Sequence, residues 1–248
     1  MIVNLDYLKN SEKGEFLIPD INYNDSMPEL YREKFTTRAL IKNILNHSTS
    51  NLIDSVFDVD YNLKTDIELI GYLENIINQK IKNYLITNDE NLLISIFNSI
   101  QIWGGNSARM FYFKNGFEKN FNLNSYKEAV LILRSGKKDS FLNAIESFKK
   151  MQKINIAYAS KHFSFWTSDL IGFEYKYPQQ LPILDRLINN LVYGKSNQPD
   201  YRHYKKYVND MFEISNYLKI DIQIIERNLF NFADTEEGKN WIKIRLNK

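Results

Sequence analysis

The sequence predicts an all-α fold, on the basis of its composition and the spacing of its apolar residues. The chain has 248 residues, of which only 5 are proline and 9 are glycine, so few residues interrupt a helix. Apolar side chains recur three and four residues apart in most segments, which is the spacing of one helix face. No segment of useful length alternates apolar and polar residues as a half-buried strand does. Hydrophobic residues make up 44% of the chain, enough for a substantial core.

Helices are expected along most of the chain after an irregular arm. Residues 1–34 form that arm, because Pro19 and Pro28 bracket a turn-rich stretch. The first helix is expected to begin near Thr36. Later helices are expected to begin at capping residues ahead of an apolar stripe, namely Asp66, Asn88 or Asp89, Asn124 or Ser125, and Asp139 or Ser140. The last four helices are expected at about 157–166, 182–192, 201–218 and 221–232.

The overall charge and the missing residue types exclude several kinds of site. The formal net charge is only +2. The chain has no cysteine, which excludes disulfides, thiolate zinc sites, cysteine-ligated iron–sulfur clusters and cysteine nucleophiles. With only 3 histidines, no metal site and no cofactor are expected. No apolar run has the length of a membrane span and the first residues lack a signal-peptide pattern, so we expect a cytoplasmic protein without a membrane partner.

One stretch of the chain is locally basic. Between Arg134 and His162 lie seven lysines and arginines but only two acidic residues, Asp139 and Glu146. Such a stretch is either a solvated helix face or a surface that meets nucleic acid. His162 itself is interpreted as a structural or surface residue.

Two short stretches carry a family resemblance. They read Ile156-Ala157-Tyr158-Ala159-Ser160-Lys161-His162-Phe163 and Leu181-Pro182-Ile183-Leu184-Asp185-Arg186-Leu187-Ile188. Together they resemble the hairpin helix and the following Asp-bearing helix of the helix-hairpin-helix superfamily of DNA glycosylases, in particular the small archaeal-type and bacterial 8-oxoguanine DNA glycosylases. The likeness covers roughly residues 85–245 and includes the C-terminal Glu237-Gly238-Lys239.

The resemblance implies a two-lobed, all-helical glycosylase-like fold. Residues 1–60 would then be an N-terminal arm and first helix that match nothing in the family pattern. Residues 61–248 would form the glycosylase-like helical domain, with its hairpin near 149–157.

The same resemblance implies that Lys161 and Asp185 are the catalytic pair. In the bacterial members the catalytic lysine directly follows the hairpin, where this chain has Ala157; Lys161 lies one helical turn later on the same face. A neutral lysine amine attacks C1′ of the nucleotide and forms a Schiff base, which permits strand cleavage. A carboxylate near C1′ stabilises the positive charge that develops as the base leaves. The pKa of the lysine is expected to be lowered by burial among Phe163, Phe165 and Trp166.

DNA contact is expected at the hairpin turn, through Lys149, Lys150, Lys153 and Asn155. The family hairpin carries glycines at the positions of Lys153 and Asn155, so that backbone N–H groups approach a phosphate closely. Asn155 is expected to make the turn, because asparagine tolerates left-handed backbone angles. Lys153 is expected to contact the phosphate through its side-chain charge, in place of the close approach of backbone N–H groups. Loss of DNA contact is the alternative that these departures leave open.

Four residues are candidates for the pocket of a flipped base: Trp103, Gly104, Trp166 and Phe230. A glycine lets the backbone approach a flat base, and aromatic rings stack on one. The alternative for Trp103-Gly104-Gly105-Asn106 is a turn that ends a helix, and the alternative for Phe230 is core packing.

The resemblance therefore implies a base-excision enzyme. It would be a DNA glycosylase with abasic-site lyase activity that removes an oxidised or modified purine-type base, such as 8-oxoguanine, from duplex DNA. The alternative is a protein of the same fold that serves a bacterial antiphage operon of the type IV CBASS kind. It would bind or process a modified nucleobase or nucleoside, with other proteins of the operon as partners. Duplex binding with a steep salt dependence would favour the enzyme.

Overall fold

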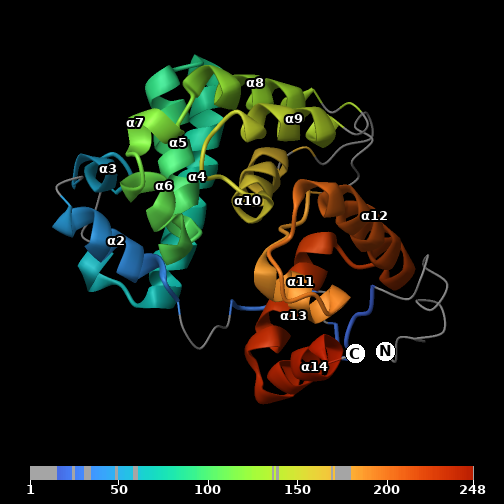
Figure 1. Cartoon of the computed structure of the whole chain (residues 1–248). Helices are drawn as coiled ribbons and strands as arrows, with labels where there is room; N and C mark the ends of the chain where they lie inside the picture. The colour runs from blue at the N-terminus through green and yellow to red at the C-terminus, as the bar shows by residue number, and fades with distance from the viewer. Residues whose placement is uncertain are drawn as a thin grey trace.

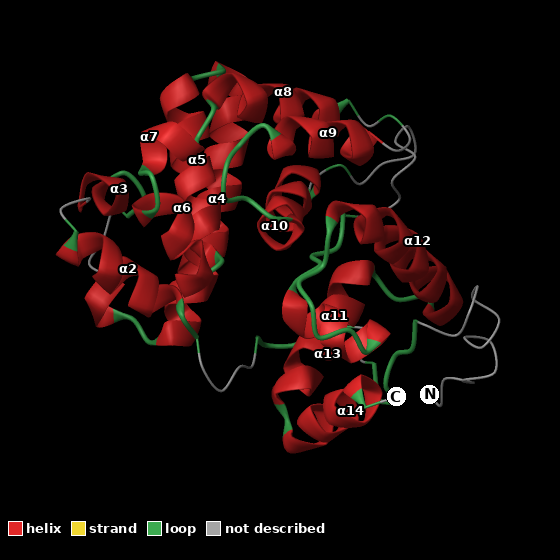
Figure 2. Cartoon of the chain, viewed as in Figure 1, coloured by secondary structure: helices red, strands yellow, loops and turns green. Residues whose placement is uncertain are grey.

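The computed structural model describes residues 16–23, 26–30, 35–47, 50–57, 61–135, 137, 140–168, 170 and 180–247. Within these ranges every regular element is a helix and there is no strand, which confirms the all-α prediction (Figure 2). The helices are α2 (Thr37–Asn46), α3 (Ser50–Asp54), η1 (Tyr61–Leu63), α4 (Asp66–Thr87), α5 (Glu90–Trp103), η2 (Asn106–Ala108), α6 (Arg109–Phe113), α7 (Phe117–Asn120), α8 (Leu123–Arg134), α9 (Ser140–Lys149), α10 (Ile156–Thr167), α11 (Arg186–Tyr193), α12 (Tyr201–Leu218), α13 (Ile222–Asp234) and α14 (Glu236–Leu246). None of these described helices is both long and apolar enough to cross a bilayer.

The helices gather in two groups, with α10 between them. Figure 1 shows α2 to α9 on one side and α11 to α14 on the other. Helix α10 packs against α4, α5, α8 and α9, and all of its twelve residues are buried. A helix buried on every face carries no amphipathic stripe, and its polar side chains must find partners inside the protein. Lys161 belongs to this helix, so its position is set by the centre of the fold.

Several helices begin at a side-chain cap close to the expected residue. Thr65 and Glu68 form a capping box at the start of α4, one residue before the expected cap Asp66. The Asp89 carboxylate accepts the N–H of Asn91 at the start of α5, as expected. Helix α8 begins earlier than expected, because Asn122 caps it by accepting the N–H of Ser125 at 2.9 Å.

The expected helix at 182–192 begins later than predicted. It is α11, and its cap is Asp185, so the preceding residues 181–184 are not helical. We call residues 181–184 the strap. The proline in it suggested the first turn of a helix, since proline is favoured there. In the structure the first turn is instead set by Asp185.

Four short or terminal helices were not expected: α3, α6, α7 and α14. The first three span five residues or fewer, which is too short to display an apolar stripe. Helix α14 starts at Thr235, whose hydroxyl accepts the N–H of Gly238 at 3.0 Å. A side chain at Gly238 would collide with the carbonyl of Phe232, so a glycine there lets α14 fold back closely onto α13.

The described part of the N-terminal arm packs on the C-terminal group of helices. Phe16 and Ile18 are buried, and the Leu17 N–H donates to the Val192 carbonyl at 2.8 Å. The ring of Phe16 lies 5.5 Å from that of Tyr193. The arm lies beside α11 before the chain crosses to α2 in the other group (Figure 1).

Candidate active site

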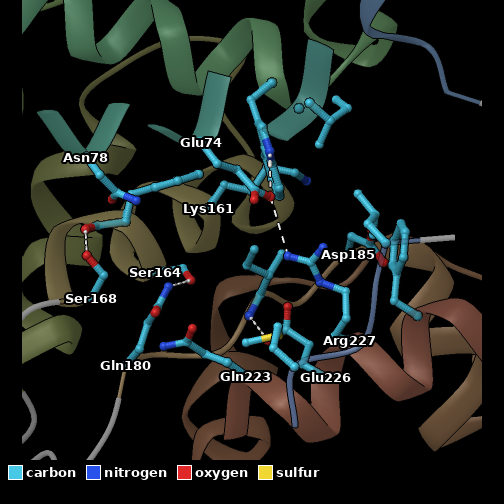
Figure 3. A pocket seen from close by; sticks show the side chains of 18 of the residues that line it. Glu74, Asn78, Lys161, Ser164, Ser168, Gln180, Asp185, Gln223, Glu226 and Arg227 are labelled. Carbon is cyan, nitrogen blue, oxygen red and sulfur yellow. Dashed lines mark hydrogen bonds and ion pairs between the residues drawn. The ribbon is translucent and has the colours of Figure 1, made fainter. Parts of the chain in front are cut away.

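A cavity of about 720 Å³ lies where the two groups of helices face each other (Figure 3). Its walls come from the N-terminal segment before α2, α4, the end of α5, α10, the strap, the start of α11, and α13. The structure brings Trp103, Gly104, Lys161, Asp185 and Phe230 to this cavity, all of which the sequence singled out. Its other charged side chains are Glu74, Lys82, Asp221, Glu226 and Arg227.

Lys161 is buried although its amine reaches the cavity. Its side chain is only 8% exposed, which excludes a simple surface lysine. The amine donates to the Ala157 carbonyl one turn earlier at 3.1 Å, and lies 4.9 Å from the centre of the Tyr158 ring. Phe165 lines the cavity beside it, whereas Phe163 is fully buried in the core. Of the expected aromatic neighbours, Phe165 is the one that shares the cavity with the amine.

Gly104 makes room for Lys161. A Cβ atom at this position would lie 2.6 Å from Tyr158 Cε1 and 3.3 Å from Lys161 Cδ. The Tyr158 hydroxyl donates to the carbonyls of Gly104 and Gly105, at 3.3 and 3.2 Å. The end of α5 therefore fits directly against the lysine stem, which gives Gly104 a packing role in addition to its place in the cavity wall.

Asp185 is the cap of α11 and is partly exposed to the cavity. One carboxylate oxygen accepts the N–H of Ile188 at 2.9 Å. This hydrogen bond fixes the orientation of the carboxylate at the first turn of α11. The structure thus places Asp185 at a helix start, as the sequence predicted, and on the wall that Lys161 shares.

The strap is tied to α10 on one side. The hydroxyl of Thr167 accepts the N–H of Leu181 at 3.0 Å, and the hydroxyl of Ser160 accepts the N–H of Leu184 at 3.1 Å. Both hydroxyls are buried. Since α10 also carries Lys161, these bonds connect the lysine helix directly to the segment that ends at Asp185.

On its other side the strap is tied to α12 and α13. Tyr204 donates to the Pro182 carbonyl at 2.8 Å, and Tyr207 donates to the Ile183 carbonyl at 3.2 Å. The Glu226 carboxylate accepts the Ile183 N–H at 2.7 Å. With the two bonds from α10, five backbone groups of a non-helical segment are satisfied by side chains, which fixes the strap in one conformation.

Glu226 is one of the cavity residues that the sequence did not single out. Burial raises its pKa to about 8; the Ile183 N–H opposes this shift, Asp185 adds to it, and Arg227 and Lys161 oppose it. The signal in the sequence is a glutamate inside the apolar stripe of a helix, between the buried Ile222 and Leu229. A carboxyl group on an apolar helix face is rarely there for packing alone.

Two further charged side chains cross the cavity from opposite groups of helices. Figure 3 shows Glu74 reaching from α4 toward Arg227 of α13, and the two are 3.4 Å apart. The same Glu74 oxygen accepts the indole N–H of Trp103 at 3.2 Å. The ring of Trp103 meets Phe165 edge to face, with centroids 5.2 Å apart. Trp103 is therefore held in a fixed orientation on the cavity wall.

Trp166 does not line the cavity, contrary to the prediction. It is fully buried, and its indole N–H donates to the Tyr126 hydroxyl at 2.8 Å. Its ring packs edge to face against Tyr84 and Tyr126 in the core of the N-terminal group.

The neighbour of Lys161 is a buried neutral histidine. His162 Nδ1 lies 2.9 Å from the Tyr126 hydroxyl, and Nε2 lies 3.2 Å from the amide nitrogen of Gln101. Complete burial, with Lys161 as a smaller cause, holds the pKa of His162 well below its usual value. His162 is a structural residue, in agreement with one of the two roles the sequence suggested.

The turn between α9 and α10 contains a left-handed residue, but it is not the expected one. Lys153 has φ of +62°, whereas Asn155 is extended and caps α10 by accepting the Tyr158 N–H at 3.3 Å. The prediction for the Asn155 backbone is therefore wrong. The capping bond requires an extended residue at 155, and the reversal of the chain then falls on 153.

The lysines of this turn are exposed and in part paired with acidic residues. Lys149 contacts Glu146 at 2.6 Å, and Lys150 contacts Glu128 at 2.8 Å. Lys153 and Asn155 are also exposed. These four residues lie together on the turn and outside the cavity, on the surface where a phosphate contact was predicted.

No cluster of three or more histidine, cysteine, aspartate or glutamate side chains in the described ranges has the geometry of a metal site. Comparison of the chain with protein-family models, with curated proteins and with solved structures finds no match. The chemistry is therefore inferred from the cavity itself.

Proposed function

We propose that the protein is a DNA glycosylase with abasic-site lyase activity, of the helix-hairpin-helix type, that removes an oxidised or modified purine-type base such as 8-oxoguanine from duplex DNA. One observation carries the proposal: Lys161 and Asp185 line the same cavity from two segments that are hydrogen-bonded to each other. A nucleophilic amine and a carboxylate on one wall are the two groups that this reaction needs.

In the proposed reaction the amine of Lys161 attacks C1′ as the base leaves. The carboxylate of Asp185 stabilises the positive charge that develops on the sugar. Its position at the start of α11 suits this role, because the bond from the Ile188 N–H holds the carboxylate on the cavity wall. The covalent amine adduct then opens to a Schiff base, from which strand cleavage follows.

The shape and walls of the cavity are consistent with a flat base. Its volume of about 720 Å³ is in the range of small-molecule sites, roughly 300–1,000 Å³. Trp103 and Phe230 line it, and enzymes that act on extruded bases stack them between such side chains. Both residues were candidates for the base pocket on sequence grounds.

The turn between α9 and α10 is the proposed DNA-facing surface. Lys149, Lys150, Lys153 and Asn155 would face phosphates there, next to the start of α10. The left-handed Lys153 and the capping Asn155 occupy the two positions where the family has glycines.

A second candidate is the accessory protein of an antiphage operon, which keeps the fold and the cavity but does not repair DNA. The ion pairs at Lys149 and Lys150 favour it, because they neutralise charge on the surface that would meet phosphates. In this case the cavity would hold a modified nucleobase or nucleoside. Duplex binding that does not weaken as salt rises would support this candidate over the enzyme.

The test of the proposed function is borohydride trapping on duplex DNA that carries one 8-oxoguanine, followed by duplexes with hypermodified bases. We expect a covalent complex with the wild-type protein and none with Lys161→Gln, because an amide cannot form a Schiff base. Lys205→Gln is the matched control, since Lys205 is exposed on α12 and does not line the cavity. Trapping that survives Lys161→Gln would refute Lys161 as the nucleophile.

A further inference from the structure

Two carboxyl groups, those of Asp185 and Glu226, line the same cavity; Asp185 directly follows the strap, and Glu226 is hydrogen-bonded to it (Figure 3). Glu226 accepts the N–H of Ile183 at 2.7 Å, and Ile183 is two residues before Asp185. The strap is fixed by side chains from three helices, so the two carboxyl groups keep a fixed relation to each other. Neighbouring carboxyl groups in one site do not both ionise readily, and one of them tends to retain its proton.

The surroundings of the two carboxyl groups differ, and the difference indicates that Glu226 is the one that keeps its proton. Asp185 lies at a helix start, is partly exposed and accepts a backbone N–H. Glu226 is partly buried in the middle of α13, and the loss of solvent around it there raises its pKa to about 8. A pair of acids whose surroundings drive their pKa values apart separates into an acid and a charged stabiliser.

The charged and titratable groups that face Glu226 come from several helices. Asp185 at the start of α11 raises its pKa further, while Arg227 of α13 and Lys161 of α10 lower it. Tyr207 of α12 also interacts with it electrostatically. Arg227 is itself paired with Glu74 of α4, and this ion pair weakens the electrostatic effect of Arg227 on Glu226.

We propose that Glu226 is the proton donor to the departing base, and that the substrate is therefore a neutral base and not a cationic, alkylated one. This proposal rests on the glycosylase function proposed above. A cationic base leaves as a neutral molecule without further help. A neutral base leaves as an anion unless an acid protonates it, so a protonated carboxyl in the cavity is useful only for the neutral class.

The step balances without any other reactant. The C1′–N bond breaks and its electron pair goes to the base nitrogen, while the lone pair of the neutral Lys161 amine forms a bond to C1′. Glu226 transfers its proton to the base and becomes a carboxylate. The ammonium nitrogen of the new Lys161 adduct then releases its proton to solvent, and the Glu226 carboxylate takes a proton back from solvent, which restores the carboxylic acid.

The test compares Glu226→Gln with wild type on two duplexes. One carries a single 8-oxoguanine opposite cytosine, and the other carries an abasic site, which has no base to protonate. Glutamine keeps an oxygen that accepts the Ile183 N–H but has no proton to transfer. We expect base release at pH 7 to fall by roughly 10²–10⁴-fold, while borohydride trapping on the abasic duplex stays at the wild-type rate.

The pH profile gives a readout that a purely structural role would not change. Wild-type base release should decline as pH rises through about 8, because Glu226 then loses its proton. This decline should be missing in Glu226→Gln. Glu213→Gln is the matched control, since Glu213 is exposed on α12 and remote from the cavity lining, and should keep the full wild-type profile.

Each outcome separates this proposal from the function on which it rests. Unchanged base release in Glu226→Gln would overturn the role of Glu226 and leave the glycosylase intact. Loss of abasic trapping together with base release would also overturn it, since the variant would then have damaged the cavity. A wild-type protein that neither releases a base nor traps abasic DNA would remove the proposed function. Independently of any substrate, ¹³C NMR of the Glu226 carboxyl should show the protonated form at pH 7, and an ionised carboxyl there would refute the proposal.

Discussion

The hydroxyl of Ser160 accepts the N–H of Leu184 at 3.1 Å, so one hydrogen bond joins the two residues that directly precede Lys161 and Asp185. The first lies in the middle of α10 and the second at the end of the strap. Of the five bonds that hold the strap, this one lies closest in the chain to both the proposed nucleophile and the proposed carboxylate. A slip of the strap against α10 would move Asp185 without moving Lys161.

Ser160→Ala tests this relationship. The substitution leaves the N–H of Leu184 buried without its partner, which should lower the free energy of unfolding by about 1–3 kcal/mol. It should also slow base release, because Asp185 loses its support. Urea denaturation and single-turnover kinetics measure the two effects.

Ser164→Ala is the matched control on the same helix. The Ser164 hydroxyl accepts from the side-chain amide of Gln180, which is only partly buried and lines the open cavity. Loss of the Ser164 hydroxyl should lower the free energy of unfolding by a smaller amount, because the Gln180 amide can then hydrogen-bond to water. Equal losses of stability and of base-release rate in the two variants would show that the bond from the Leu184 N–H to Ser160 contributes no more than the bond from Gln180 to Ser164.

Gly104→Ala should disturb the site from the side of α5. The added methyl would lie 2.6 Å from a ring atom of Tyr158, whose hydroxyl is bonded to the carbonyls beside it, and 3.3 Å from the stem of Lys161. We expect the amine to shift and trapping to fall by more than about tenfold, as small displacements of reacting groups cost rate steeply. Gly71→Ala is the control, because a Cβ there meets no described atom within 4 Å. It should leave trapping unchanged and stabilise α4 by about 0.5–1 kcal/mol.

The long helices could be predicted from the sequence because their signals are local. Helix α12 spans Tyr201–Leu218 as expected, with Asp200 as its cap and an apolar stripe along one face. The strap could not be predicted, because the groups that satisfy its backbone lie far away in the chain. Tyr204 and Tyr207 looked like core residues in a helix stripe, and they are buried, but their hydroxyls also hold Pro182 and Ile183.

The candidate site was predicted in part for the same reason. Lys161 and Asp185, which line one cavity, were singled out because the stretches around them resemble a family pattern. Glu226 was missed, since its role depends on a cavity wall formed by residues more than forty positions away, such as Ile183 at 2.7 Å. Trp166 was misplaced because its side of α10 cannot be told from the sequence when every residue of that helix is buried.

The stability of the protein should fall in mild acid because of His162. In the folded state burial holds its pKa well below the value of about 6.5 that it has in the unfolded chain. Below pH 6.5 the unfolded state therefore binds a proton that the folded state does not, and the free energy of unfolding falls by up to about 1.4 kcal/mol per pH unit. Above pH 6.5 this contribution is constant.

Glu226 has the opposite effect on the pH dependence of stability, so the contribution of His162 must be obtained by comparing the wild type with a His162 variant. The raised pKa of Glu226 means that the folded state keeps a proton that the unfolded state releases, and stability falls as pH rises from about 4.5 to about 8. Urea denaturation of wild type and His162→Gln at several pH values separates the two. The acid slope should be smaller in His162→Gln, and parallel curves would show that His162 is protonated in the folded protein.

Asp185→Asn decides whether Asp185 is more than a helix cap. Asparagine caps a helix as well as aspartate does, so α11 and the overall stability should be retained. The charge beside the sugar is lost, and base release should slow by about two to three orders of magnitude, the loss seen when one stabilising group is removed from a preorganised site. Duplex binding should be equal or tighter, because a negative charge near the phosphates is gone. Since Asp185 also raises the pKa of Glu226, the decline of activity with rising pH should begin at a lower pH in this variant.

Asp200→Asn is the matched control: Asp200 caps α12 by accepting the N–H groups of Arg202 and His203, and it does not line the cavity. If Asp185→Asn and Asp200→Asn both release base at the wild-type rate, Asp185 does no more than Asp200 does, and the positive charge on the sugar must be stabilised by another group of the cavity.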